Sequence, residues 1–323
     1  MSLASGPLVS VITPVYNNAE HIEECIESVL RQTYTNWEYT VVDNCSTDGS
    51  GEIARRYAAG DPRIRVVANQ RHLRAIENHN RSLREISAAS KYTKMVFADD
   101  WIFPECIEKM VEVAEQHPSV GIVGAYGIQG RDVMWTGLPY PSTCTPGRDV
   151  CRLLLLKELY VFGTATSLLY RSDLVRVHDP FYNEDNLHAD METCVVLMKE
   201  ADFGFVHQIL TFKRLRADSL GSMSDDINTV LAGQLQNLVA HGRDFLSPEE
   251  FEACFKRFMS SYYNFLAVRA LQGRRDDKFW KYHRKKLGDA GVGFSRARVV
   301  FAIVARVLRG AGHLMPAVVA RNQ

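Results

Sequence analysis

The first part of the chain alternates short β-rich runs with stretches of helical spacing, and this alternation restricts the possible folds more than any other feature. Strands that alternate with helices are joined by right-handed crossovers and pair into a mostly parallel sheet. The pattern therefore predicts an α/β protein whose mostly parallel sheet is flanked by helices. The strands are expected at 8–15, 38–43, 63–69, 94–98 and 119–126, and the helices between them at 18–33, 51–59, 74–89 and 104–116.

Polar residues follow three of these strands at the point where each strand is expected to end. Residues 14–17 follow the first strand, residues 43–48 the second, and Asp99 with Asp100 the fourth. Open parallel sheets bind ligands outside the carboxyl ends of their strands. We therefore expect the three clusters to converge on one crevice, although they lie far apart in the sequence.

Each cluster also has a purely structural interpretation. The segment from Asp43 to Asp48 can be a strand-to-helix turn, in which short polar side chains satisfy free backbone groups. Alternatively, the Asp43 carboxylate accepts a hydrogen bond from an N–H group of a nucleotide base. Asp99 and Asp100 can cap a helix before Pro104, or they can bind a divalent cation together with the oxygens of a diphosphate.

Two later segments carry charged residues that suit the same crevice. Asp190 is either the N-cap of its helix or a general base, and its spacing to Glu192 does not place both carboxylates on one helix face. We expect only Asp190 at the reacting centre and a structural role for Glu192. Lys213, Arg214 and Arg216 form a basic cluster, which is either a solvated edge strand or a clamp for a diphosphate.

The missing motifs and the charge balance narrow the class of protein. The chain contains neither G-x-G-x-x-G nor G-x-x-x-x-G-K-[ST], so a dinucleotide dehydrogenase and a P-loop NTPase are both disfavoured. Its formal net charge is +0, which gives no indication of a nucleic-acid partner. An acidic pair, a base-reading aspartate and a basic segment instead suit a nucleoside diphosphate with a divalent cation.

The segments VSVITPVYN, VVDNCSTDGS and MVFADDW occur in this order in the chain. With this combination the chain resembles the family 2 glycosyltransferases, which have the Rossmann-like GT-A fold, over residues 8–219. The resemblance implies a nucleotide-diphospho-sugar donor, a hydroxyl acceptor on a glycan, polysaccharide or lipid-linked molecule, and Mg²⁺ or Mn²⁺. It also implies uracil or thymine as the base of the donor, with guanine as the alternative.

The resemblance further assigns roles to individual residues. Asp190 would be the catalytic base of an inverting transfer, and Asp99 and Asp100 would be metal ligands. Arg214 and Arg216 would contact the diphosphate. The residues assigned to the nucleotide pocket are Pro14, Val15, Tyr16, Asn17, Asp43, Asn80 and Asp99.

Three positions depart from the pattern of the family. Phe97 replaces the first aspartate of the D-x-D motif, Ala189 replaces a glutamate before the catalytic aspartate, and Arg216 replaces a histidine. These departures leave open a non-catalytic relative that binds sugar nucleotides. A nucleotidylyltransferase is a third possibility, although PVYNNAEHIEE lacks the Gly-rich basic loop expected after the first strand of such an enzyme.

The segments between the sheet and the C-terminal third are less regular. Residues 129–147 are rich in Gly, Pro, Ser and Thr and predict a long surface loop over the crevice. Residues 163–175 predict a strand that enters a helix. Residues 203–216 predict a pair of strands.

The last third of the chain has a helical pattern from about Asp225 onward. We predict a GT-A domain at 1–222 and a helical region at 223–323. Residues 251–271 are expected to form an amphipathic helix that packs on the catalytic domain. Residues 294–310 combine an apolar run with arginines, which predicts either peripheral contact with a membrane interface or a buried or dimer-forming helix.

Cysteine usage and the N-terminal sequence favour a cytoplasmic protein, with the inner face of the membrane as an alternative location. The seven cysteines are scattered and form no C-x-x-C pair, which is typical of a reducing compartment. The N-terminus shows neither a charged region nor a long apolar run, so no signal peptide is expected. No uninterrupted apolar stretch is long enough to predict a spanning helix.

Overall fold

The computed structural model describes residues 6–215, 227–273 and 277–312. The chain forms two compact units, Met1–Met223 and Ser224–Gln323. The predicted boundary near Ser222–Asp226 lies outside the described residues, and the assignment of a separate role to each part stays a prediction.

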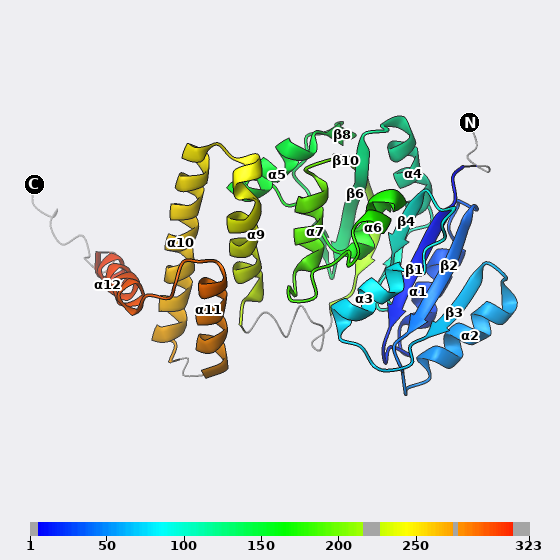
Figure 1. The fold of residues 1–323 in the computed structure, drawn as a ribbon, viewed down its shortest axis with the longest axis horizontal. Coiled ribbons are helices and arrows are strands. Elements are labelled where there is room, and N and C mark those ends of the chain that lie inside the picture. The colour runs from blue at the N-terminus through cyan, green and yellow to red at the C-terminus, as the bar shows by residue number, and fades with distance from the viewer. Residues whose placement is uncertain (1–5, 216–226, 274–276, 313–323) are drawn as a thin grey trace, which may run out of the picture. The chain divides into compact units, whose positions relative to one another are not determined.

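The first unit is built on one mixed sheet of ten strands (Figure 1), in the order β3-β2-β1-β4-β9-β6-β10-β5 with β7 and β8 at its side. β1 pairs in parallel with β2 and β4, β2 with β3, and β6 with β10. β9 lies antiparallel between β4 and β6. The strands are β1 Val9–Val15, β2 Trp37–Asp43, β3 Ile64–Ala68, β4 Tyr92–Met95, β5 Trp101–Ile102, β6 Val120–Gln129, β7 Asp132–Met134, β8 Cys144–Thr145, β9 Leu168–Arg171 and β10 Asp202–Lys213.

The α/β prediction is confirmed, with a sheet that is mixed beyond β4. The connecting helices fall where the spacing predicts them, although α1 and α3 are shorter than expected. One helix, α5, was not predicted. The helices of this unit are α1 Ile22–Leu30, α2 Ser50–Gly60, α3 Ala75–Leu83, α4 Cys106–Gln116, α5 Gly147–Leu156, α6 Ser172–Val177 and α7 Ala189–Leu197, with a 3₁₀ turn at Ala165–Ser167.

The first strand and the helix that follows it each show one local feature. β1 runs through Pro14 to Val15, as predicted, and pairs there with the end of β2. A proline is tolerated here because the pairing of β1 with β4 already ends at Ile12, so no second neighbour needs a backbone N–H at Pro14. The N-cap of α1 is His21, whose side chain forms no capping hydrogen bond.

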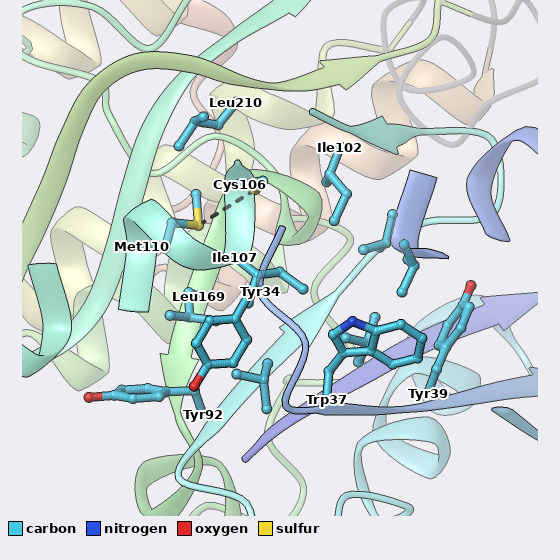
Figure 2. Packing of buried hydrophobic residues seen from close by; sticks show 14 of the residues in the cluster. Tyr34, Trp37, Tyr39, Tyr92, Ile102, Cys106, Ile107, Met110, Leu169 and Leu210 are labelled. Carbon is cyan, nitrogen blue, oxygen red and sulfur yellow. Dashed lines mark hydrogen bonds between the residues drawn. The ribbon is translucent and has the colours of Figure 1, made fainter. Parts of the chain in front are cut away.

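The core of this unit lies between the sheet and the helices α1 and α4. Val11 and Tyr39 from the strands pack with Ile26 of α1 and Met110 of α4, and all four side chains are fully buried. Figure 2 shows Trp37 and Tyr39 of β2 among the residues of this cluster. The thiol of Cys106 is directed at the sulfur of Met110, 3.9 Å away. This packing fixes the strands whose carboxyl ends carry the polar clusters.

Two segments outside the regular strand and helix pattern contain more secondary structure, or fewer turns, than the sequence predicts. Residues 129–147 are not a simple surface loop, because they include β7 and β8 and bury Trp135 and Leu138. The predicted strand pair at 203–216 is a single strand over its described part, since register shifts let β10 run through without a turn.

The second unit is helical, as predicted. α10 begins with a capping box formed by Ser247 and Glu250, with a proline in the favoured first turn. None of the described helices in either unit is long and apolar enough to cross a membrane. The helices of the second unit are α9 Thr229–Phe245, α10 Pro248–Leu271, α11 Asp277–Asp289 and α12 Arg296–Gly312.

Candidate active site

The loops that follow β1 and β2 are joined by hydrogen bonds between backbone and side chains. The backbone N–H of Asn17 donates to Oγ of Ser46 at 3.1 Å, and the N–H of Thr47 donates back to Oδ1 of Asn17 at 2.8 Å. The N–H of Ala19 donates to Asp48 at 2.8 Å. Thr47 and Asp48 therefore shape the turn, as the structural interpretation of this segment predicted.

Asp43 lies at the end of β2, opposite Val15 at the end of β1, and is almost completely buried. Its Oδ1 accepts a hydrogen bond from the N–H of Ser46 at 2.9 Å. A Cβ added to Gly51 would lie 2.4 Å from Asp43 Oδ2, so only glycine lets the first turn of α2 approach this carboxylate. The carboxylate is thus held in one position at the predicted edge of the sheet.

An aromatic pair borders the same edge. The ring of Tyr16 contacts the imidazole of His72 with a centroid distance of 4.4 Å. Tyr16 is exposed, whereas Pro14 and Val15 are buried within β1. The three residues lie where the sequence places the nucleotide pocket, and their contact with a nucleotide stays a prediction.

Asp99 and Asp100 occupy the turn between β4 and β5, on the same edge of the sheet as Asp43. Asp100 is buried, and both of its carboxylate oxygens accept hydrogen bonds. Oδ2 accepts from the hydroxyl of Thr166 at 2.7 Å, and Oδ1 accepts from the backbone N–H of Arg214 at 3.0 Å. Burial, together with the negative charge of Asp99, raises the pKa of Asp100 to about 7. These contacts favour a positioning role for Asp100 over the predicted metal contact.

A buried lysine of β4 fixes the segment that contacts the Asp99–Asp100 turn. Lys94 of β4 is completely buried, and its ammonium donates to the backbone carbonyls of Thr166 at 2.5 Å and Leu168 at 3.1 Å. The hydroxyl of Thr166 in turn accepts the N–H of Phe97 at 3.1 Å. Thr166 therefore connects Lys94, Phe97 and Asp100 in one network.

The end of β10 brings the basic residues to the acidic turn. Nε of Arg214 donates to the backbone carbonyl of Asp99 at 3.1 Å, and its guanidinium also pairs with Glu24 of α1. The positive charge of Lys213 is close enough to lower the pKa values of both Asp100 and Asp190. Arg216, the other predicted diphosphate contact, lies outside the described residues.

Asp190 is the second residue of α7, so it is not the N-cap of that helix, which is His188. Its Oδ1 accepts the N–H of Met191 at 2.8 Å. Burial raises the pKa of Asp190, and Lys213 opposes this effect only in part. A carboxylate with a raised pKa and a cation nearby has the properties of a general base.

The segment before α7 is held by Asn80 of α3. The side-chain amide of Asn80 donates to the carbonyl of Tyr182 at 2.8 Å and accepts the N–H of Tyr182 at the same distance. These bonds occupy much of its polar surface, so they favour a positioning role, and the predicted nucleotide contact of Asn80 is not tested. Glu192 accepts hydrogen bonds from the amides of Asn183 and Asn186, in agreement with its predicted structural role.

Phe97, which replaces the first aspartate of the D-x-D motif, belongs to a row of three aromatic rings with His79 and Tyr182. Its ring stacks on the imidazole of His79 at a centroid distance of 4.9 Å, and His79 also meets the edge of Tyr182 at 6.3 Å. Burial lowers the pKa of His79 to about 4, so the imidazole is neutral at physiological pH. These three rings connect the segment of Phe97, next to the acidic turn, with the segment of Tyr182 that precedes α7.

The donor set fits a divalent cation held jointly by protein and diphosphate. Among the described residues, no group of three or more histidine, cysteine, aspartate or glutamate side chains could hold a metal by itself. Mg²⁺ and Mn²⁺ bound to nucleotides need only one or two carboxylates, because phosphate oxygens and waters complete the shell. Asp99 is partly exposed next to the basic end of β10 and is the carboxylate best placed to bind such an ion.

Comparison with known proteins identifies the class of the chain. The family described as Glycosyl transferase family 2 matches residues 10–176, which is more than half of the sequence. The chain belongs to this family, and the predicted resemblance is confirmed.

Two relatives and two solved structures illustrate the relationship. TuaG of Bacillus subtilis (strain 168), described as a teichuronic acid biosynthesis glycosyltransferase, is 35% identical over 217 residues, which cover 67% of this chain and 82% of TuaG. EpsE of the same organism, also described as a glycosyltransferase, is 33% identical over 176 residues, which cover 52% of this chain and only 62% of EpsE.

The solved structures share the fold at low sequence identity. The structure of TarS of S. aureus (residues 1–349) with UDP-GlcNAc superposes with a TM-score of 0.69 at 16% identity, covering 94% of this chain and 92% of that one. The mannosyltransferase PcManGT of Pyrobaculum calidifontis, solved with GDP-Man and Mn²⁺, gives a TM-score of 0.55 at 17% identity, covering 96% of this chain and 81% of that one. The predicted GT-A fold is confirmed.

Several residues of this site carry no signal in the sequence. Thr166 lies in a short 3₁₀ turn, 66 positions from the aspartate that it contacts, and nothing in its neighbourhood marks it. The stacking of His79 on Phe97 joins residues of α3 and the β4–β5 connection, which only the three-dimensional fold brings together.

Proposed function

We propose that this protein transfers a sugar from a nucleotide-diphospho-sugar donor to a hydroxyl acceptor with inversion of configuration. The observation that carries the proposal is the arrangement around Lys213, whose charge acts on Asp100 in the acidic turn and on Asp190 at the start of α7. These charge effects support a site that would combine a place for a diphosphate with a carboxylate suited to accept a proton.

The proposed reaction follows from the positions of these groups. The carboxylate of Asp190 takes the proton of the acceptor hydroxyl, and the hydroxyl oxygen forms a bond to the anomeric carbon. The bond from that carbon to the diphosphate oxygen breaks on the opposite face, and its electron pair leaves with the nucleoside diphosphate. The sugar passes through an oxocarbenium-like transition state, as in glycoside hydrolysis.

The developing negative charge on the leaving group needs compensation. Lys213 and Arg214 lie beside the acidic turn and can face the diphosphate, where ionised hydrogen bonds are strong. A divalent cation on Asp99, when bound, would supply further positive charge at the same oxygens. Asp100 and Thr166 would act by holding the turn that carries Asp99.

The donor and the acceptor are proposed only as chemical classes. The names of the relatives support a glycan or cell-envelope polysaccharide as acceptor, and UDP-sugars are supported by the TarS complex. A lipid-linked acceptor, a homodimer and a cytoplasmic location remain predictions from the sequence.

A thermal-shift panel tests the donor site. We expect UDP, or else GDP, TDP or CDP, to raise the melting temperature, and Mn²⁺ to increase this shift. A ligand at a hundredfold excess over its dissociation constant stabilises the native state by about 2.7 kcal/mol. Asp99→Asn should remove the metal-dependent part of the shift. Asp173→Asn is the matched control, since Asp173 follows β9 at the opposite end of β4, where Tyr92 pairs with Arg171.

Product analysis separates the enzyme from a non-catalytic relative. The anomeric configuration of the product, measured by NMR against that of the donor, should be inverted. Nucleotide binding without transfer to any acceptor panel would favour the non-catalytic alternative that Phe97 and Ala189 leave open. Retention of configuration would contradict the role of Asp190 as a base.

A further inference from the structure

Helix α12 of the second unit presents a stripe of large apolar side chains to solvent. Its exposed members have relative accessibilities between 49% and 75% and recur at helical spacing. Single exposed apolar residues are common, but a contiguous set on one helix marks an interaction surface. The members of this apolar stripe are Val300, Phe301, Val304, Val307 and Leu308.

The opposite side of α12 is already used for packing on α10. Val299 is buried, and the helix starts at a fixed point because the N–H of Ser295 donates to the hydroxyl of Tyr263 at 2.9 Å. The guanidinium of Arg298 lies 5.6 Å from the centre of the Tyr263 ring. The apolar stripe is therefore not the face by which the helix completes the fold of its own unit.

The charge around the stripe has one sign. Arg296 and Arg298 are exposed, and a period of 3.6 residues places them near opposite edges of the stripe. Arg306 is also exposed, but the same period places it beside Val299, away from the stripe. No aspartate or glutamate follows Asp289 anywhere in the sequence. An apolar stripe edged by Arg296 and Arg298, on a helix without acidic residues, is complementary to a surface that is apolar inside and negatively charged outside.

We propose that α12 docks this protein on the surface of a membrane that contains anionic lipids. The helix lies in the interface with its apolar stripe among the acyl chains and its arginines among the phosphates. A second copy of the chain fits this surface less well. In a two-fold dimer the same stripe meets itself, which brings the arginines of both copies together without any acidic partner from the helix. The proposal does not depend on the transferase activity.

Flotation of the full chain with lipid vesicles tests the proposal. We expect binding to vesicles of phosphatidylcholine mixed with phosphatidylglycerol, weaker binding to phosphatidylcholine alone, and a decrease with rising salt. Replacing Arg296 and Arg298 by glutamine should weaken binding about fivefold for each arginine removed. Phe301→Ser combined with Val304→Ser should reduce binding to the level of phosphatidylcholine alone.

The matched control is Leu271→Ser at the end of α10, where an apolar side chain of similar exposure lies outside the stripe. It should bind vesicles as the unchanged chain does. Circular dichroism and the nucleotide thermal shift should be the same for all variants, which separates loss of docking from loss of fold or of donor binding. No binding to anionic vesicles at low salt would overturn the proposal. So would a concentration-dependent dimer that the Phe301→Ser and Val304→Ser changes dissociate, since the stripe would then be a contact between two copies.

Discussion

The acidic turn at Asp99–Asp100 and the start of α7 at Asp190 hold carboxylates in two different ways. Both oxygens of Asp100 accept protein hydrogen bonds, and the network behind them runs through Thr166 to Lys94. Asp190 accepts a bond from the N–H next to it and is otherwise affected by burial and by the charge of Lys213. The pKa is raised in both cases, but among the described residues only one oxygen of Asp190 accepts a hydrogen bond, whereas both oxygens of Asp100 do.

This difference separates positioning from proton transfer. A carboxylate whose oxygens both accept protein hydrogen bonds can fix the backbone of a turn, but an acceptor hydroxyl or a metal ion can reach it only if one of these bonds is lost. A carboxylate with a raised pKa and little hydrogen bonding can accept a proton when a hydroxyl approaches. The comparison therefore predicts large effects on turnover at Asp190 and small ones at Asp100.

The largest effect is expected for Asp190→Asn. The amide keeps the size of the side chain but cannot accept the proton, so kcat should fall by about 10²–10⁴-fold. The dissociation constant of the donor nucleotide, measured by calorimetry, should change little. An equal loss of nucleotide affinity would show that Asp190 belongs to the donor site, and the contrast between the two carboxylates would then disappear.

A second test compares Thr166→Val with Thr166→Ser. Valine leaves Asp100 Oδ2 and the N–H of Phe97 without partners, which costs about 1–3 kcal/mol, whereas serine retains the hydroxyl. We expect the valine variant to bind Mn²⁺ and donor about tenfold more weakly in titrations followed by thermal shift. Serine should restore affinity. Equal behaviour of the two variants would mean that the hydroxyl does not position the turn.

The pH profile tests the link between Lys213 and Asp190. The base must be ionised, so kcat/KM should fall as the pH decreases through the pKa of Asp190. Because Lys213 lowers that pKa, Lys213→Met should raise it and move the acid limb of the profile to higher pH. Lys213→Arg keeps the charge and should leave the limb near its original position. If the acid limb of the kcat/KM profile does not move in Lys213→Met, then Lys213 does not lower the pKa of Asp190.

The smallest effect on turnover is expected for Asp100→Asn. The asparagine carbonyl can still accept from Arg214, and its amide can donate to the hydroxyl of Thr166. The same change should alter the pH dependence of stability. With a folded pKa of about 7, Asp100 binds its proton more tightly in the native than in the unfolded state, so the free energy of unfolding should fall as pH rises from about 4 to about 7.

Denaturant titrations at several pH values measure that slope. The asparagine variant should lack the part of the slope that Asp100 contributes. A large loss of metal-dependent activity in Asp100→Asn would instead support the predicted role of Asp100 as a metal ligand.

The sequence predicts the fold best where local patterns and topology agree. The alternation of strands and helices, and the polar residues at strand ends, place Asp43 and Asp99 on one edge of the sheet correctly. The order of strands beyond β4 was not predictable, because β9 enters the sheet antiparallel through contacts that no local pattern encodes. The helix α5 was missed because its segment begins in a stretch rich in glycine and proline.

The sequence predicts which acidic and basic residues belong to the site, but it does not predict which of them contact one another. Asp99 and Asp100 are adjacent in sequence, and only their burial and partners distinguish them. Asn80 matches the pattern of a ligand contact, yet its amide is engaged with the backbone of Tyr182. Contacts between residues that are distant in sequence decide such roles, and a single sequence does not display them.

The hydrogen bonds between the loops after β1 and β2 have a consequence for the energetics of donor binding. Asn17, Ala19 and Thr47 already donate their backbone N–H groups to neighbouring side chains without any ligand. A loop ordered in advance gives up little conformational entropy when a nucleotide arrives, so most of the contact energy is retained as affinity. Amide hydrogens in these two loops should therefore exchange slowly with solvent in the free protein, and the addition of nucleotide should change their exchange rates less than those of the other loops at this edge.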